Sequence, residues 1–148
     1  MDPFSISSAN ELFAAFPEWR AVAREEPADD GSSFLVIEIK PPVEAHVEHG
    51  LVIDTSNQEI TVGFDCYHSH FDQWVGDGNH FGTQAALHFV KQVVSEQVAV
   101  ISWWQGEQWR GSSQLEAGTQ PEQPQWQTHF DRIRIRSWKG SLNADINA

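Results

Sequence analysis

The sequence predicts an α+β fold: an antiparallel sheet of about five or six strands, one main helix at about residues 80–97 on one face of it, and a short N-terminal helix. Two observations lead to this prediction. Short β-branched runs separated by turn residues recur along the chain, and one long stretch between them repeats its apolar residues at helical spacing. We expect residues 1–148 to form a single domain, because 40% hydrophobic residues suffice to close one core.

The first 40 residues predict a helix, a loop and a strand. Residues 7–10 offer N-cap side chains for a short helix at residues 11–16, which Pro17 interrupts. Residues 25–33 are acidic and contain proline and glycine, so they predict a solvated loop. The β-branched run at residues 34–39 predicts a strand buried on both faces.

The middle of the chain predicts a hairpin, the main helix and a second pair of strands. Residues 51–54 and 60–64 are extended runs joined by a short polar segment, which is typical of an antiparallel hairpin. Residues 80–97 carry one apolar stripe and form the predicted core helix. Residues 98–104 and 108–113, joined by a turn, predict two neighbouring strands.

The C-terminal region combines a long connection with the clearest strand. Residues 115–128 have no periodicity and predict a surface connection. Residues 132–138 alternate strictly, so Arg132, Arg134 and Arg136 share one face while the isoleucines between them face the core. We expect these arginines to be neutralised by carboxylates of the chain itself, or by a second copy in a homodimer.

Two adjacent tryptophans, Trp103 and Trp104, lie in one of the predicted strands. Successive strand residues point to opposite faces, so both can be buried only if the sheet is covered on both sides. We expect one of the two to face a surface or an interface.

The charge and cysteine content limit the classes of function. A formal net charge of −12 disfavours nucleic acid and anionic membranes as partners and favours a basic protein. The whole excess lies in residues 1–79, with 15 acids and 3 bases. One cysteine, Cys66, allows no intramolecular disulfide, no apolar run is long enough to cross a bilayer, and the first residues lack the pattern of a signal peptide. We expect a cytoplasmic protein.

Residues 41–90 form an acidic window without Lys or Arg that also holds six of the seven histidines. Within it, His68, His70 and Asp72 have the form H-x-H-x-D, and residues two apart on an extended segment project to one side. A metal ion held by these three side chains, with His80 as a further ligand, is one interpretation. The alternative is a strand end at which the histidines donate to nearby carboxylates such as Asp65 or Asp72.

No constellation of catalytic residues appears in the sequence. The acidic surroundings of Cys66 push its thiol toward the neutral form, so a small buried residue is the favoured role over a nucleophile. Phosphate-binding glycine motifs and hydrolase motifs are absent from the chain. We therefore expect a protein that is not an enzyme and needs no cofactor.

Three segments of the chain carry a family resemblance: residues 61–71, residues 100–109 with their paired tryptophans, and residues 133–142. Together they resemble small bacterial immunity proteins, which are encoded beside toxins of the contact-dependent, Rhs and type VI secretion systems. The resemblance implies a cytoplasmic, non-catalytic protein that binds and neutralises one cognate toxin domain. The negative charge independently suits a basic, nuclease-like toxin.

Charge and exposure arguments indicate which residues contact such a partner. The expected contacts are the acids of the window with two aromatic anchors: Glu44, Glu48, Asp54, Glu59, Asp65, Tyr67, Asp72, Trp74 and Asp77. Two other functions fit the sequence less closely. One is a metal-dependent enzyme or metal-binding protein using His68, His70 and Asp72. The other is a structural or chaperone-like subunit with a large exposed apolar patch.

Overall fold

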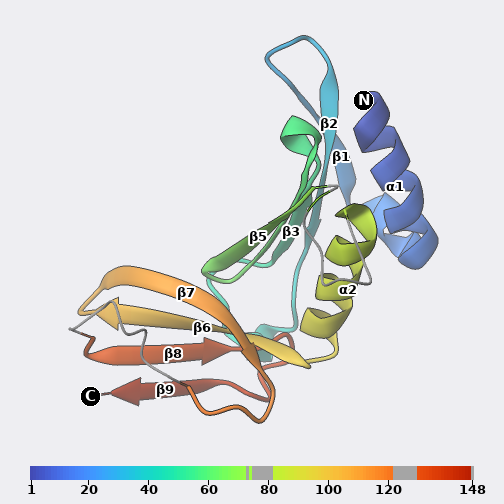
Figure 1. The fold of residues 1–148 in the computed structure, drawn as a ribbon. Coiled ribbons are helices and arrows are strands. Elements are labelled where there is room, and N and C mark those ends of the chain that lie inside the picture. The colour runs from blue at the N-terminus through green and yellow to red at the C-terminus, as the bar shows by residue number, and fades with distance from the viewer. Residues whose placement is uncertain (73, 75–81, 122–129, 148) are drawn as a thin grey trace. The chain divides into compact units, whose positions relative to one another are not determined.

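The structure is a computed structural model of the 148-residue chain, and it describes all residues except 73, 75–81, 122–129 and 148. Its α+β class is the predicted one, with an N-terminal helix and a main helix. The strands form two antiparallel sheets, of five and four strands, where the sequence predicted one sheet of five or six (Figure 1).

The chain divides into two compact units, each discontinuous in sequence. The N-terminal unit comprises Met1–Lys40, Gly50–Phe64 and His68–Lys91, and the C-terminal unit comprises Pro41–His49, Asp65–Tyr67 and Gln92–Ala148. Each unit contains one of the two sheets. The expectation of a single domain stays a prediction.

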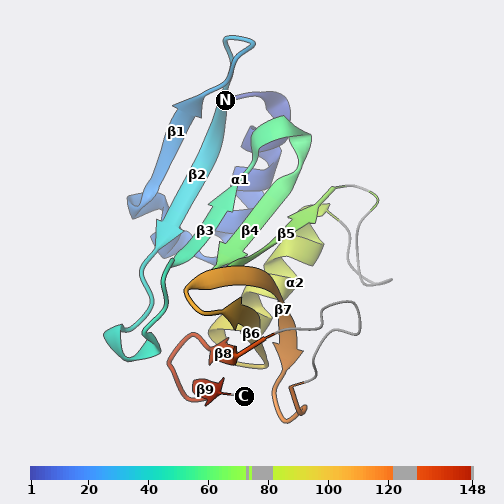
Figure 2. The same ribbon diagram turned by 90° about the vertical axis from the view of Figure 1, so that its left-hand side faces the viewer.

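The N-terminal unit is built on a five-stranded antiparallel meander. Its strands follow in chain order as β1 (Ala23–Pro27), β2 (Ser33–Ile39), β3 (Leu51–Asp54), β4 (Ile60–Phe64) and β5 (Tyr67–Phe71). The helices α1 (Pro3–Ala15) and α2 (Gly82–Val94) lie on the same face of this sheet (Figure 2). Two short 3-10 helices of the described residues complete this unit, η1 (Pro17–Ala21) and η3 (Ser56–Gln58), and a third, η2 (Val43–Ala45), belongs to the C-terminal unit.

The core of the N-terminal unit lies between its sheet and the two helices. Alternate residues of β2, β3 and β4 are almost fully buried, as a sheet with one covered face requires: Leu35, Ile37, Leu51, Ile53, Ile60, Val62 and Phe64. Phe89 of α2 packs against Phe71 of β5, with ring centroids 5.8 Å apart. Neither described α-helix combines the length and the apolar content that a membrane-spanning helix needs.

Two N-terminal elements differ from the predictions. Helix α1 begins at Pro3 instead of residue 11, because the Asp2 side chain caps it by accepting from the Ser5 amide at 2.7 Å and Pro3 occupies the first turn. The predicted loop at residues 25–33 is wrong in its first part, since β1 runs from Ala23 to Pro27. This edge strand is largely exposed and polar, so it shows no apolar alternation.

The C-terminal unit contains the four-stranded sheet, in the order β7 (Gln108–Glu116), β6 (Val98–Gln105), β8 (Arg132–Arg136) and β9 (Ala144–Asn147). The strands predicted at residues 98–104, 108–113 and 132–138 are present. Strand β7 continues to Glu116, so the predicted connection at 115–128 begins later, and most of that connection lies outside the described residues. Strand β9 was not predicted.

Strand β6 is buried along both faces. On one face Trp103 joins Ile101, Ile133 and Ile135 in an apolar cluster, and its ring lies 6.2 Å from that of Phe130. On the other face Trp104 is also buried, and its indole N–H donates to Ser102 Oγ at 2.8 Å. The expectation that one of the paired tryptophans faces a surface or an interface is therefore wrong: the sheet is covered on both sides.

Candidate functional site

The acidic window of the sequence does not belong to one structural unit. Asp54, Glu59, Asp72 and Trp74 belong to the N-terminal unit, whereas Glu44, Glu48, Asp65 and Tyr67 belong to the C-terminal unit. Asp77 and His80 lie outside the described residues. The predicted contact set is therefore best considered unit by unit.

His70 forms a small polar group on strands β4 and β5. Its Nδ1 lies 2.8 Å from a carboxylate oxygen of Glu59 and 3.0 Å from Thr61 Oγ1. The imidazole ring of His68 meets that of His70 edge to face, with centroids 5.0 Å apart. The prediction that a histidine of this pair contacts a nearby carboxylate is confirmed for His70, but the acid is Glu59 instead of Asp65 or Asp72.

Asp72 fixes the local backbone that follows β5. Its carboxylate accepts from the amide of Trp74 at 2.7 Å. In the part of the chain that the structure describes, no three His, Cys, Asp or Glu side chains form a group that could hold a metal ion. Among the described residues, His68, His70 and Asp72 thus do not form the metal site of that interpretation.

Asp54 also has a local structural role in the N-terminal unit. Its carboxylate accepts from both the amide and the hydroxyl of Ser56, at 3.1 and 2.6 Å. This is the usual way in which a short acidic side chain fixes a turn. The turn leads from β3 into η3, so Asp54 positions the segment that lines the hollow described below.

Asp65 is an internal structural residue of the C-terminal unit. Its side chain is 1% exposed and accepts from Arg134 and from the amide of Glu48, each at 2.7 Å. Its backbone adopts a left-handed conformation, with φ of 51°, which aspartate tolerates better than most residues. Because the carboxylate is buried and neutralised by Arg134, it holds the unit together and presents no charge to a partner.

Cys66, next to Asp65, carries an unreactive thiol. Burial and the neighbouring carboxylate of Asp65 raise the pKa of this thiol to about 12. Its S–H donates to a carboxylate oxygen of Glu48 at 3.5 Å, and its backbone carbonyl accepts from Ser112 Oγ. The thiol is therefore protonated at neutral pH, but Cys66 is half-buried and not the buried residue that the sequence predicted.

The arginine face of β8 is neutralised largely within the chain. Arg134 pairs with Asp65 and lies 3.7 Å from Glu48, and Arg136 makes two contacts of 3.2 Å with Asp145. Intrachain neutralisation is thus confirmed for two of the three arginines. The guanidinium of Arg132 instead lies over the ring of Trp104, 5.1 Å from its centroid.

The remaining predicted contacts of the C-terminal unit differ in exposure. Glu44 and Glu48 are exposed, and Tyr67 is half-buried, with its hydroxyl accepting from the Gln114 side chain at 3.4 Å. Tyr67 therefore has a contact within its own unit. In the N-terminal unit Trp74 is by contrast 79% exposed, the second most exposed large apolar side chain described.

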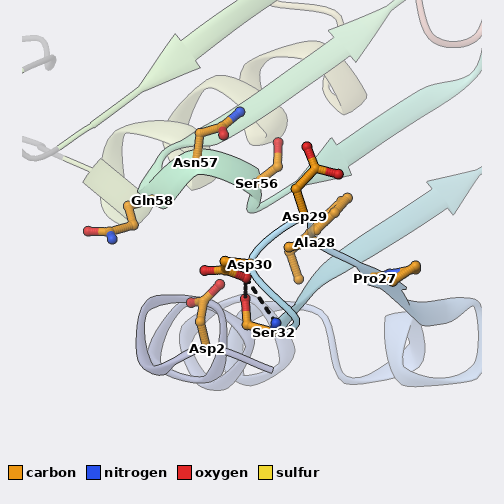
Figure 3. A pocket seen from close by; sticks show the side chains of 10 residues that line it. Asp2, Pro27, Ala28, Asp29, Asp30, Ser32, Ser56, Asn57 and Gln58 are labelled. Atoms are coloured by element: carbon orange, nitrogen blue, oxygen red, sulfur yellow. Dashed lines mark hydrogen bonds between the residues drawn. The ribbon is translucent and has the colours of Figure 1, made fainter.

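The N-terminal unit carries a hollow of about 540 Å³ that sequence analysis missed. We call it the acidic hollow. Three segments form it: the N-cap of α1, the β1–β2 turn with the strand residues beside it, and η3 (Figure 3). Its lining contains three carboxylates and no Lys or Arg: Asp2, Pro27, Ala28, Asp29, Asp30, Ser32, Phe34, Ser56, Asn57 and Gln58.

Two of the three carboxylates of the acidic hollow are fixed by hydrogen bonds. Asp2 accepts from the amide and the hydroxyl of Ser5, at 2.7 and 3.1 Å. Asp30 accepts from the hydroxyl and the amide of Ser32, at 2.6 and 2.9 Å, and these bonds lower the pKa of Asp30. Asp29 is exposed and makes no hydrogen bond or ion pair with any described residue. The hollow is therefore a preformed negative site.

The sequence contained part of the signal for this site. Residues 25–33 are acidic and predict a solvated loop, so the sequence does not indicate which other residues lie near Asp29 and Asp30. Asp2 reaches them because its amide donates to the carbonyl of Ser33 at 2.9 Å, which ties the start of α1 to the beginning of β2. This contact joins residues far apart in the sequence, and the neighbouring strand β1 has no apolar pattern from which its position could be predicted.

Comparison of the chain with protein-family models, with curated proteins and with solved structures found no match.

Proposed function

We propose that this protein is an immunity protein: it binds a cognate, basic bacterial toxin domain in the cytoplasm and neutralises it without catalysis. The observation that carries the proposal is the acidic hollow of the N-terminal unit, with three carboxylates and no Lys or Arg in its lining. The family resemblance of residues 61–71, 100–109 and 133–142 supports the same class of function.

The distribution of charge between the units supports the N-terminal unit as the binding unit. By sequence it contains 12 Asp and Glu against 4 Lys and Arg, a balance of −8, whereas the C-terminal unit contains 9 against 5, a balance of −4. One of the four bases, Arg24, already pairs with Glu26 and Glu38 at 2.7 Å each. A basic domain is therefore attracted mainly by the N-terminal unit, and the attraction increases the association rate.

The acidic hollow suits a lysine or arginine side chain of the toxin. Carboxylates accept charge-assisted hydrogen bonds from both cations, and Asp29 supplies a negative charge that no described residue neutralises. Asp2 and Asp30 are held in place before binding, so no side chain has to be ordered to form these contacts. A toxin arginine that is bound in this hollow cannot take part in the reaction that the toxin catalyses.

Trp74 is the proposed aromatic anchor of the same unit. An indole that is 79% exposed offers a large apolar surface to a partner, and tryptophan is among the residues that contribute most to binding at interfaces. Asp54, Glu59 and Asp72 are the other acids of the predicted contact set in this unit, and they add to its negative charge. Asp65 is left out of the proposed contacts because it is buried.

The test uses the toxin domain encoded beside this chain, with binding measured by titration calorimetry and neutralisation by survival of cells that produce both proteins. Asp29→Lys reverses one charge in the acidic hollow without removing a hydrogen bond. Its matched control is Glu116→Lys, the same charge change at an exposed position of the C-terminal unit. We expect Asp29→Lys to weaken binding by about tenfold or more, equal to about 1.4 kcal/mol, and Glu116→Lys by less than about threefold.

Salt dependence gives a second readout. Binding through the acidic hollow predicts an association rate that falls as ionic strength rises from 50 to about 500 mM, because the Debye length shortens to a few ångströms. Equal weakening by the two reversals, or no dependence on salt, would overturn the role of the hollow. No binding to the neighbouring gene product at all would overturn the immunity function itself.

A further inference from the structure

The C-terminal unit contains a second hollow, of about 440 Å³, whose chemistry is opposite to that of the first. We call it the arginine hollow. Two guanidinium groups and an indole form part of its lining: His46, Val47, Glu48, Trp104, Glu107, Arg132 and Arg134. All seven residues belong to the C-terminal unit, so the hollow is formed within that unit alone. Its volume is within the range of small-molecule sites.

Arg132 is the unusual member of this lining. Arg134 and Arg136 on the same strand face pair with carboxylates, but Arg132 makes no ion pair with any described residue. The Nε atoms of Arg132 and Arg134 are buried and have no hydrogen-bond acceptor among the described residues. A buried N–H group without an acceptor destabilises a protein, and native structures rarely retain one.

We propose that the arginine hollow binds a carboxylate group, held by the guanidinium of Arg132 above Trp104. A carboxylate is planar and offers two acceptor oxygens, which match the parallel N–H donors of a guanidinium. Bound there, it accepts from the guanidinium of Arg132 and neutralises the arginine of the β8 face that has no carboxylate partner among the described residues.

The remaining lining favours a carboxylate over a phosphate. Glu48 and Glu107 contribute two negative charges to the same hollow, and Asp65, which pairs with Arg134, has a second carboxylate oxygen that is buried without a hydrogen-bond donor. These groups repel a phosphate that carries almost two charges more strongly than a carboxylate that carries one. Two sources offer this group: a free small carboxylic acid and the C-terminal carboxylate of a peptide.

This inference does not rest on the proposed toxin partner. The acidic hollow attracts cations in the N-terminal unit, and the arginine hollow binds an anionic group in the C-terminal unit. Loss of toxin binding by Asp29→Lys leaves the carboxylate site unaffected. Loss of the carboxylate site by a change at Arg132 leaves the charge of the acidic hollow unaffected.

The experiment is a ¹H–¹⁵N NMR titration that follows the arginine Nε–Hε signals of the whole chain. Sodium acetate is added at constant ionic strength, with sodium chloride replaced in step, and inorganic phosphate is titrated in parallel. We expect acetate to shift the Arg132 signal with a saturable curve and phosphate to bind more weakly. Arg132→Gln should weaken acetate binding at least tenfold, whereas Lys139→Gln, an exposed cation of the same unit, should change it less than twofold.

Two peptides then distinguish the sources. Triglycine with a free carboxylate and triglycine amide differ only in the group proposed to bind. Tighter binding of the free peptide than of acetate, with no binding of the amide, assigns the site to a peptide C-terminus, and acetate binding as tightly as the peptide assigns it to a small acid. A linear response to acetate in the wild-type chain, or tighter binding of phosphate, would overturn the proposal without any variant having to fold.

Discussion

The two units of this protein use carboxylates in different ways. In the C-terminal unit, Asp65 and Asp145 pair with arginines of β8, and Glu96 closes a turn, so these three acids hold the structure together. In the N-terminal unit, the acidic hollow gathers three carboxylates without a base in its lining. The net charge of −12 is therefore unevenly distributed, with −8 in the N-terminal unit and −4 in the C-terminal unit.

The largest expected effect tests the structural acids at Asp65. Asp65→Asn keeps the size and the left-handed backbone preference but removes the charge that neutralises Arg134. Breaking a buried ion pair costs about 3–5 kcal/mol, because a charge is left without compensation. We expect the free energy of unfolding, measured by urea denaturation, to fall by about 3 kcal/mol. Asp145→Asn, which removes a carboxylate that is 52% exposed from its pair with Arg136, should cost less than about 1 kcal/mol, and equal losses would contradict the comparison.

The next effect tests how tightly the C-terminal unit is closed at Gly140. This glycine has φ of 81°, and a Cβ atom placed there would overlap the backbone carbonyl of Glu44. Gly106 has a similar φ of 59° with open space around it. Gly106→Ala should therefore cost about 1 kcal/mol for backbone strain, and Gly140→Ala about 2–3 kcal/mol for strain and overlap together. The same urea titration checks both, and equal costs would mean that the segment carrying Glu44 yields freely.

A smaller effect tests Glu96, which closes the turn after β8. Its carboxylate accepts from Ser137 Oγ and from the amides of Lys139 and Ser141, at 2.6, 2.8 and 3.2 Å. Burial raises its pKa, but these hydrogen bonds outweigh that effect and lower the pKa to about 2. Glu96→Gln should lower the free energy of unfolding by about 1–2 kcal/mol at pH 7.

The pH dependence of this loss identifies its cause. A carboxyl group with a lowered folded pKa stabilises the protein fully above its unfolded pKa, near 4.5, and loses that contribution as the pH falls toward 2. The difference in unfolding free energy between the wild type and Glu96→Gln should therefore be constant above about pH 5.5 and shrink below pH 4.5. A difference that does not change between pH 6 and 3 would show that the charge of Glu96 plays no part.

The smallest effect on stability is expected at Asp29, which the N-terminal unit presents without a partner. Asp29→Asn removes no described hydrogen bond or ion pair, so the free energy of unfolding should change by less than about 0.5 kcal/mol. Because the substitution removes one of the three carboxylates of the acidic hollow, it reduces the repulsion among them. Any change in the free energy of unfolding should therefore be an increase. A loss above 1 kcal/mol would place Asp29 among the structural acids and break the contrast between the units.

Much of the fold was predictable because it follows from apolar patterns. The alternation of Arg132, Ile133 and their neighbours identified β8, and the apolar stripe identified α2. The missed elements are those without such a pattern: β1 is exposed and polar, and β9 has one large apolar residue, Ile146. The division into two sheets was not predictable, since local patterns do not specify which strands pair.

The candidate sites were predictable only in their chemistry. The sequence identified an acidic region and an arginine face, and it left open whether carboxylates of the chain or of a second copy neutralise the arginines; for Arg134 and Arg136 they belong to the chain. It could not tell that Asp65 is buried, because an acid in a turn is usually exposed. Nor could it bring Asp2 beside Asp29 and Asp30, because that requires the contact between the start of α1 and β2.

The protonated thiol of Cys66 has a practical consequence for studying this molecule in solution. A cysteine introduced at an exposed, uncharged position of the lining such as Pro27 ionises far more readily than a thiol whose pKa is about 12. A maleimide dye therefore labels the introduced cysteine selectively, and the native cysteine needs no replacement. A fluorophore placed in this way at the edge of the acidic hollow would report the arrival of a basic partner directly, in a chain that is otherwise unaltered.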